Sequence, residues 1–122
     1  MTEAHEIALA AARAARDAKA KEVVVLDLRG LSFVTDFFVI GNGDSEIQVQ
    51  SIAAKVKEEM EKIGVRALRT EGYREARWVL LDFGVVVVHI FHRDTRGFYN
   101  LERLWGDAQV VENDYSQGQT EI

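Results

Sequence analysis

A glycine-rich turn is the segment whose residue types best suit phosphate binding. It consists of Gly41, Asn42, Gly43, Asp44 and Ser45. It joins an expected strand to an expected helix, where backbone N–H groups can hold a phosphate. The spacing matches neither common nucleotide motif, because Glu stands at position 46 and no Gly-Lys-Ser/Thr follows. Asp44 would also repel an anion. We therefore interpret the segment as a turn followed by a helix cap.

Two histidines, His89 and His92, have a spacing that is often seen in metal sites. On a helix they would share a face, but the surrounding residues predict a strand, in which side chains three apart point to opposite sides. His5 is remote in the chain, and the sequence contains no cysteine. Because a protein metal site usually needs at least three such ligands, the sequence predicts no metal and no cofactor.

Three aspartates, Asp27, Asp36 and Asp82, stand at the ends of expected strands, where catalytic residues of α/β proteins often gather. No second carboxylate accompanies any of them in a D-x-D or D-x-E pair, and no G-x-S-x-G motif occurs. Aspartates at strand ends more often cap turns. The sequence therefore predicts no catalytic residues, and we expect a binding protein rather than an enzyme.

The composition is that of one ordinary globular domain. The chain has 122 residues, 48% hydrophobic and 29% charged, with a formal net charge of −5. An acidic surface does not suit a protein that binds nucleic acid on its own. No apolar run approaches the roughly 20 residues that span a membrane. The N-terminal segment carries Glu3, Glu6 and Asp17, unlike a signal or transit peptide, so we expect a cytoplasmic location.

The pattern of apolar residues predicts an α/β fold, with a mixed β-sheet of about five strands flanked by helices. Ser45 and Gln48 mark the start of the clearest helix, and Gly64 marks its end. The strand–helix–strand unit around it should be a right-handed parallel crossover. The expected helices are 3–20, 45–63 and 95–105, and the expected strands are 23–28, 37–40, 65–69, 77–82 and 85–91. Residues 1–108 should form the domain and residues 109–122 a flexible tail.

The two strands at 77–91 should form an antiparallel hairpin that is apolar on both faces. Alternation places Trp78, Leu80 and Asp82 on one side, and His89 and Phe91 share one side of the partner strand. One face must cover the core. The other must meet a helix, a second copy of the chain or a different protein, because a large open apolar face is a binding site or an aggregation hazard. The sequence leaves these alternatives open.

Several segments, taken together and in order, resemble the ribosomal silencing factor family, also called the iojap-like family. They cover roughly residues 5–108. The segments are residues 24–31 (Val-Val-Leu-Asp-Leu-Arg-Gly-Leu), 35–40 (Thr-Asp-Phe-Phe-Val-Ile), 48–49 (Gln-Val), 71–72 (Glu-Gly), 77–84 (Arg-Trp-Val-Leu-Leu-Asp-Phe-Gly), 86–92 (Val-Val-Val-His-Ile-Phe-His), 98–99 (Phe-Tyr) and 101–108 (Leu-Glu-Arg-Leu-Trp-Gly-Asp-Ala). Val85 departs from the Asp that is usual at this position in the family.

The resemblance implies a nucleotidyltransferase-like fold without the catalytic motif. It also implies a protein that binds a ribosomal protein on the joining face of the large subunit and sterically excludes the small subunit, and that is often a homodimer when free. Two alternatives remain, a nucleotidyltransferase-like enzyme and a large-subunit assembly factor. We expect the docking face to contain Tyr73, Trp78, Leu80, Asp82, His89 and Phe91, with Arg74 and Arg77 beside it.

A local cluster of arginines around Tyr73 has two interpretations. Arg66, Arg69, Arg74 and Arg77 lie close together in the sequence. They could form a solvated loop that offsets the acidic helix before it, or they could make a minor contact with ribosomal RNA, since clustered arginine is a common but unspecific feature of RNA-binding surfaces. The sequence does not decide between the two.

Overall fold

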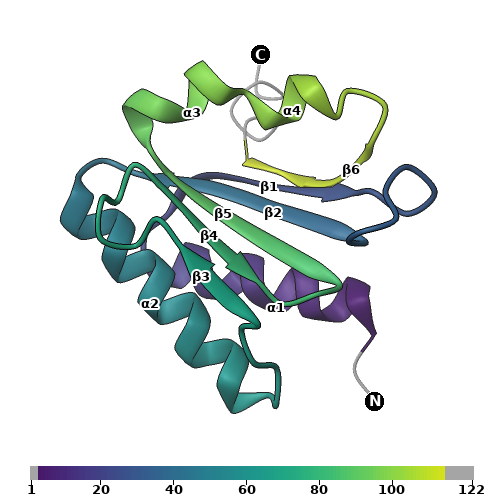
Figure 1. The fold of residues 1–122 in the computed structure, drawn as a ribbon, viewed down its shortest axis with the longest axis horizontal. Helices are drawn as coiled ribbons and strands as arrows, with labels where there is room; N and C mark the ends of the chain where they lie inside the picture. Colours follow the sequence, from purple (N-terminus) through teal and green to yellow (C-terminus); the bar gives the residue numbers. More distant parts are fainter. Residues whose placement is uncertain (1–2, 115–122) are drawn as a thin grey trace.

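Six strands form one mixed sheet in the computed structural model, which describes residues 3–114 of the chain (Figure 1). The order across the sheet is β3-β4-β5-β2-β1-β6. β2 and β5 are parallel, and every other neighbouring pair is antiparallel. The strands are β1 (Lys21–Asp27), β2 (Phe37–Gly43), β3 (Arg69–Glu71), β4 (Trp78–Asp82), β5 (Val86–His92) and β6 (Gln109–Asn113). The predicted fold class is confirmed, with one strand more than expected.

The crossover around the long helix α2 (Glu46–Lys62) reaches further than the sequence suggested. β3 runs in the same direction as β2, but β5 and β4 lie between them in the sheet. β5 takes the central place because all seven of its residues are buried, as expected for an apolar run that is covered on both sides. β3 has only three residues and forms one edge. The predicted β4–β5 hairpin is confirmed, with Trp78 opposite Phe91 and Leu80 opposite His89.

Helices α1 (Ala4–Asp17) and α2 cover one side of the sheet, which we call the first face. The alanines of α1 are small enough to bring its backbone close to the strands, and Ala8, Ala11 and Ala15 are fully buried. On α2, Ser45 Oγ accepts the N–H of Gln48 at 3.1 Å, so the predicted cap is confirmed. The strand side chains of the first face are Val23, Val25, Phe37, Val39, Val79, Leu81, Val86, Val88 and Ile90.

The opposite side of the sheet, the second face, carries two short helices, α3 (Arg93–Tyr99) and α4 (Leu101–Leu104). The single helix expected at 95–105 is interrupted at Asn100, which adopts a left-handed conformation with φ of 43°. In Figure 1 these helices lie above the sheet, away from α2. The buried side chains of this smaller cluster are Val24, Leu26, Leu28, Ile40, Phe91 and Leu101.

A buried arginine attaches α3 to the sheet. Arg96 Nη1 donates to the backbone oxygen of Glu22 at 2.6 Å and to Asn42 Oδ1 at 2.8 Å. Its Nη2 donates to Glu102 at 2.9 Å, which ties α4 to the same point. Because hydrogen bonds to a charged group are stronger than neutral ones, this contact fixes the position of the α3–α4 segment over the second face.

The prediction of a flexible tail from residue 109 is wrong for residues 109–113, which form β6 beside β1. Ion pairs hold this edge: Arg16 contacts Glu112 at 2.7 Å and Asp114 at 3.0 Å. Asp114 also accepts the backbone N–H of Val23 at 3.1 Å. The apolar pattern missed β6 because an edge strand can be held by charged partners that lie far away in the sequence. The rest of the predicted tail, residues 115–122, lies outside the described residues.

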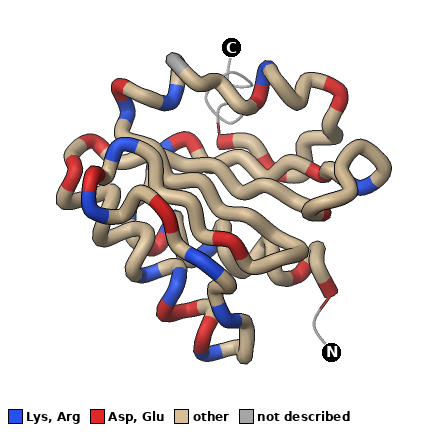
Figure 2. Tube along the Cα trace, in the orientation of Figure 1, with Lys and Arg blue, Asp and Glu red and all other residues tan. Residues whose placement is uncertain are grey.

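Charged residues gather on α2 and on the loops near it, whereas the centre of the sheet is almost free of them (Figure 2). On α2, Lys62 pairs with Glu59 at 2.8 Å and Lys55 with Glu59 at 3.4 Å, which are pairs between neighbouring helical turns. Within residues 3–114, none of the helices combines the length and the apolar character that a membrane span requires.

Candidate functional site

The second face is only partly covered, and its open part is rich in aromatic side chains. β4 and β5 place Trp78, Leu80 and His89 on this face, and β2 adds Phe38. Trp78, Leu80 and Phe38 are half-buried. From the covering segment, Tyr99 is 45% exposed and Leu104 is 74% exposed. This combination of an aromatic floor and an exposed apolar rim is typical of a protein-binding surface.

The aromatic rings pack on one another across β2, β4, β5 and the α3–α4 segment with the residue that follows it. Trp78 stacks on Phe91 with ring centroids 5.1 Å apart and contacts Tyr99 at 4.6 Å. Phe38 meets His89 edge-on at 4.4 Å and Trp105 at 5.9 Å. Such contacts stabilise beyond the burial of apolar area, so the floor of the second face is held in place by packing.

His89 lies beneath this surface and is almost fully buried. Its Nδ1 accepts the indole N–H of Trp78 at 3.0 Å. Burial lowers the pKa of His89 from 6.5 to about 3, because the charged imidazolium would lose its hydration in this apolar setting. His89 is therefore neutral at ordinary pH, and it contributes a hydrogen bond rather than a charge.

Charged groups border the open surface at the β3 edge. Arg69 Nε donates to Asp82 at 3.1 Å, and Arg69 Nη1 donates to Glu71 at 2.6 Å. Asp82 also accepts the N–H of Gly84 at 2.8 Å, which closes the β4–β5 turn. Two carboxylates thus share one arginine, and this border has a net negative charge.

The structure separates the residues that the sequence placed on one docking face. Trp78, Leu80 and Asp82 lie side by side on the second face and are half-buried. His89 and Phe91 share that face, as strand alternation predicted, but they are buried beneath other side chains and are not open to direct contact with a partner. The reason is that α3, α4 and the large rings of Trp78 and Tyr99 cover the centre of the sheet.

The remaining predicted residues lie elsewhere. Tyr73 is exposed and lines a groove between α2 and β3 that also includes Ala53 and Leu81, so it belongs to the first-face side. The backbone oxygens of Tyr73 and Arg74 accept hydrogen bonds from the Gln50 side chain at 3.0 and 3.3 Å. The Arg74 side chain is exposed.

Sequence reasoning left Phe38, Tyr99 and Leu104 out of the docking face. The alternation of β2 could have revealed Phe38, since its neighbours Phe37 and Val39 face the first side. Tyr99 and Leu104 belong to the α3–α4 segment. Tyr99 packs on Trp78, and the placement of this segment depends on the Arg96 contacts, so it could not be read from spacing.

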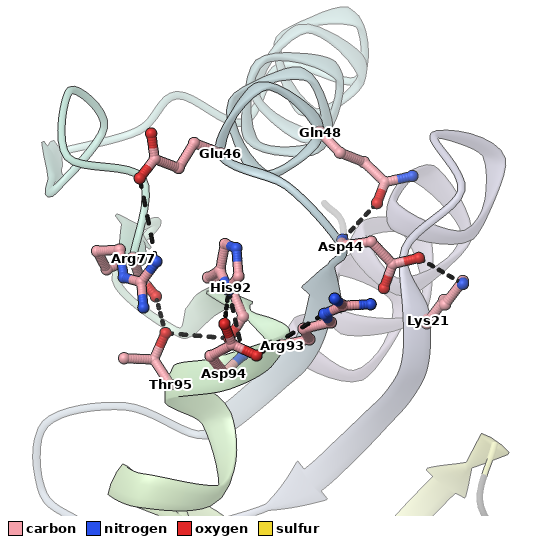
Figure 3. Close-up of polar contacts among 9 residues, drawn as sticks. All are labelled: Lys21, Asp44, Glu46, Gln48, Arg77, His92, Arg93, Asp94 and Thr95. Atoms are coloured by element: carbon pink, nitrogen blue, oxygen red, sulfur yellow. Dashed lines mark hydrogen bonds and ion pairs between the residues drawn. The ribbon is translucent and has the colours of Figure 1, made fainter.

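A polar cluster lies where β2 and β5 end and where α2 and α3 begin (Figure 3). Here Lys21 contacts Asp44 at 2.5 Å, and this hydrogen bond lowers the pKa of Asp44. Gln48 accepts the N–H of Asp44 at 2.5 Å, and Arg77 lies 4.0 Å from Glu46. The carboxylates at this junction are thus matched by cations. The hydrogen bonds at residues 44–48 are those of a turn and a helix cap, as the sequence predicted.

His92 caps α3 in the same cluster, since its Nδ1 accepts the N–H of Asp94 at 3.1 Å (Figure 3). His89 uses the same ring nitrogen to bind Trp78. The two histidines therefore have separate structural partners. Among residues 3–114, no three side chains of the metal-binding types come together in a way that could hold an ion.

Comparisons with known proteins give a consistent result. Residues 1–121 match the family model described as "Ribosomal silencing factor during starvation". The chain is 51% identical over 107 residues to Ribosomal silencing factor RsfS of Halalkalibacterium halodurans, covering 88% of this chain and 92% of that protein. It is 47% identical over 109 residues to the protein of the same name in Bacillus subtilis, covering 89% and 92%.

A plant protein and a solved structure extend the likeness. Protein Iojap, chloroplastic, of Zea mays is 39% identical over 105 residues, which cover 86% of this chain and 46% of the plant protein. A crystal structure of a Chromobacterium violaceum protein superposes with a TM-score of 0.84 at 35% identity, covering 86% of this chain and 88% of that one. A Bacillus halodurans structure superposes with a TM-score of 0.79 at 48% identity, covering 88% and 98%.

Proposed function

Because the chain belongs to the ribosomal silencing factor family, we propose that it binds the large ribosomal subunit and prevents the small subunit from joining. The contact would be a ribosomal protein on the joining face of the large subunit. Binding there occupies space that the small subunit needs, so translation is repressed by occupancy and no chemical step is required. We choose the residues of this chain that contact the partner from the family resemblance and from their position on the open second face.

The observation that carries this proposal is the half-buried Trp78 on an open aromatic surface. We define the docking face as the second-face residues Phe38, Trp78, Leu80, Asp82, Tyr99 and Leu104. Trp and Tyr are enriched among residues that dominate binding energy at interfaces. A standard interface buries about 800 Å² on each partner, which a domain of this size can supply.

Charge favours a protein partner with a basic rim. The chain carries a net charge of −5, and Asp82 of the docking face shares the partner Arg69 with Glu71 at its border. Complementary charge would guide the approach of the partner and fix its register. Val85, which is 40% exposed at the adjacent turn, lacks the acid that is usual in the family, so the border here is less acidic than in relatives that retain it.

Two secondary contacts complete the proposal. Arg74 and Arg77 are exposed outside the docking face and are available for a minor contact with ribosomal RNA.

In the free protein, the open apolar surface would be covered by a second copy of the chain, giving a homodimer that separates or rearranges on the ribosome. Since its partner is the ribosome, we place the protein in the cytoplasm.

Subunit joining tests the proposal directly. Purified large and small subunits are mixed with and without the protein, and the formation of whole ribosomes is followed in a sucrose gradient. We expect the protein to sediment with the large subunit and to reduce the whole-ribosome peak in proportion to occupancy. Normal joining at saturating protein would refute the blocking function. Sedimentation with the small subunit alone would refute the choice of partner.

A further inference from the structure

We propose that His89 is a positioning residue, which holds the Trp78 indole in one orientation and thereby makes the aromatic centre of the docking face apolar toward its partner. The inference rests on the proposed function for its binding consequence. Its structural part, the fixed orientation of Trp78, can be measured on the protein alone.

The hydrogen bond defines the state of the imidazole. The indole nitrogen of Trp78 can only donate, and it lies 3.0 Å from His89 Nδ1. Nδ1 must therefore be the unprotonated nitrogen, and the ring proton is on Nε2. Nε2 is buried and has no hydrogen-bond partner among the described residues. The ring of Phe38 lies 4.4 Å from the imidazole at an angle of 72°, a geometry in which N–H groups can interact weakly with an aromatic ring.

A buried N–H without a conventional partner lowers the stability of the fold. A histidine at this position therefore calls for some other advantage that offsets this loss. Among the described residues, the His89 side chain makes one conventional hydrogen bond, the one to Trp78. A leucine at this position would satisfy packing without burying a polar group. The imidazole is thus suited to accepting the indole proton, and protonation would abolish that acceptor. Deep burial keeps the ring neutral.

Three contacts restrict Trp78. Besides the hydrogen bond to His89, its ring stacks on Phe91 at 27° and packs against Tyr99 at 45°. Without the hydrogen bond, packing alone would leave the indole free to choose between rotamers that fill a similar space. The hydrogen bond therefore selects one orientation, and less entropy is lost when a partner binds.

The orientation also determines what the partner must offer. The one polar atom of the Trp78 side chain points inward to His89, so the exposed part of the indole is hydrocarbon. A partner surface that contacts it needs no hydrogen-bond acceptor there. The structure therefore fits aliphatic side chains of a protein at the centre of the docking face, rather than a phosphate or the polar edge of a base.

The test compares two substitutions of His89 in the full chain. His89→Asn keeps an acceptor on the same γ carbon, whereas His89→Leu removes it. Two-dimensional NMR with tryptophan labelled at the indole nitrogen reports the hydrogen bond through the chemical shift and the exchange rate of the Trp78 indole proton. Affinity for purified large subunits is measured in parallel. Val88→Ala, in the same strand but facing the first side, is the control for general destabilisation.

We expect His89→Leu to speed exchange of the indole proton and to weaken binding roughly 3- to 10-fold, the usual size of one net hydrogen bond. His89→Asn should retain slow exchange and most of the affinity. Val88→Ala should leave the exchange rate of the indole proton and the affinity for large subunits unchanged in the folded protein. Slow exchange in His89→Leu would overturn the positioning role, and so would wild-type affinity in a variant whose indole proton exchanges fast.

A second variant covers the case in which His89→Leu does not fold. Trp78→Phe keeps an aromatic ring but removes the donor, so it should bind several-fold more weakly than the natural protein. Wild-type affinity of Trp78→Phe would show that the fixed indole is not needed. If the natural protein itself fails to bind large subunits, the proposed function fails, while the NMR comparison still decides whether His89 positions Trp78.

Discussion

The two faces of the sheet use the same strands for different purposes. The first face is sealed by two long helices and buries aliphatic side chains such as Val79, Leu81 and Val88. The second face is covered by two short helices and leaves Trp78 and Leu80 half-buried. Successive residues along β4 therefore alternate between the buried core of the first face and the partly open surface of the second. We therefore expect stability to depend mainly on the first face, and we propose that partner binding depends on the second.

The largest expected effect tests the first face. Ile52→Ala removes a fully buried side chain from α2, so the free energy of unfolding should fall by about 2–5 kcal/mol. Affinity per folded molecule should not change. Chemical denaturation followed by circular dichroism measures the loss. Ile47→Ala is the matched control, because Ile47 lies on the same helix and is 77% exposed. An equal loss in both variants would contradict the assignment of the core.

The second face is tested by Trp78→Ala, which should weaken binding to large subunits by about 2 kcal/mol or more if Trp78 is an interface hot spot. Tyr73→Ala removes an exposed aromatic side chain on the other side of the sheet and should have a clearly smaller effect. Sedimentation of each variant with large subunits gives the affinities, and circular dichroism confirms folding. A larger loss for Tyr73→Ala would move the docking site to the groove beside α2.

Acid should lower the free energy of unfolding because His89, on the second face, is buried in its neutral form. The pKa of His89 is lowered to about 3 in the folded protein, so below pH 6.5 the unfolded chain takes up a proton that the folded chain does not. The stability from neutral His89 is present above pH 6.5 and is lost as the pH falls toward 3. Between pH 7 and pH 5 the loss should be about 2 kcal/mol.

Denaturation curves of the natural protein and of His89→Leu, recorded at several pH values, isolate this contribution. The variant lacks the titrating group, so its stability should change less between pH 7 and pH 5. Parallel pH profiles for the two proteins would show that His89 is not the group responsible, and the account of its burial would then be wrong.

The smallest effect concerns the helix that covers the first face. Ser45→Ala removes the oxygen that accepts the N–H of Gln48 and should cost about 1 kcal/mol of stability. Ser51→Ala, at an exposed position inside the same helix, should be neutral or slightly stabilising because alanine favours helix. Thermal unfolding compares the two. Any change in ribosome affinity on Ser45→Ala would show that the two faces are not independent.

The fold was predictable where local patterns are strong. The cap at Ser45, the apolar stripe of α2 and the alternation in β4 and β5 each follow from a few adjacent residues. β6 was not predictable in this way, because it is held by Arg16, which is 96 residues from Glu112 in the sequence. The break at Asn100 was also missed, since nothing in the apolar spacing marks a left-handed residue there.

The candidate site was predictable only in part. Strand alternation assigned Trp78, Leu80 and Asp82 to one side correctly. Alternation could not reveal that His89 and Phe91 on the same side are buried, because their exposure depends on rings and helices contributed by other segments. Nor could it separate Tyr73 from this group, since the segment before β4 turns toward α2.

The sequence by itself determined the fold class, the capped helix, the hairpin and the family, because these depend on short-range periodicity and on ordered motifs. Only the tertiary structure decided which face of the hairpin stays open and how Trp78 is held there. The physical reason is that exposure is a property of packing between distant segments: Arg96 fixes the α3–α4 segment over the second face, and the covering segment determines which side chains a partner can reach.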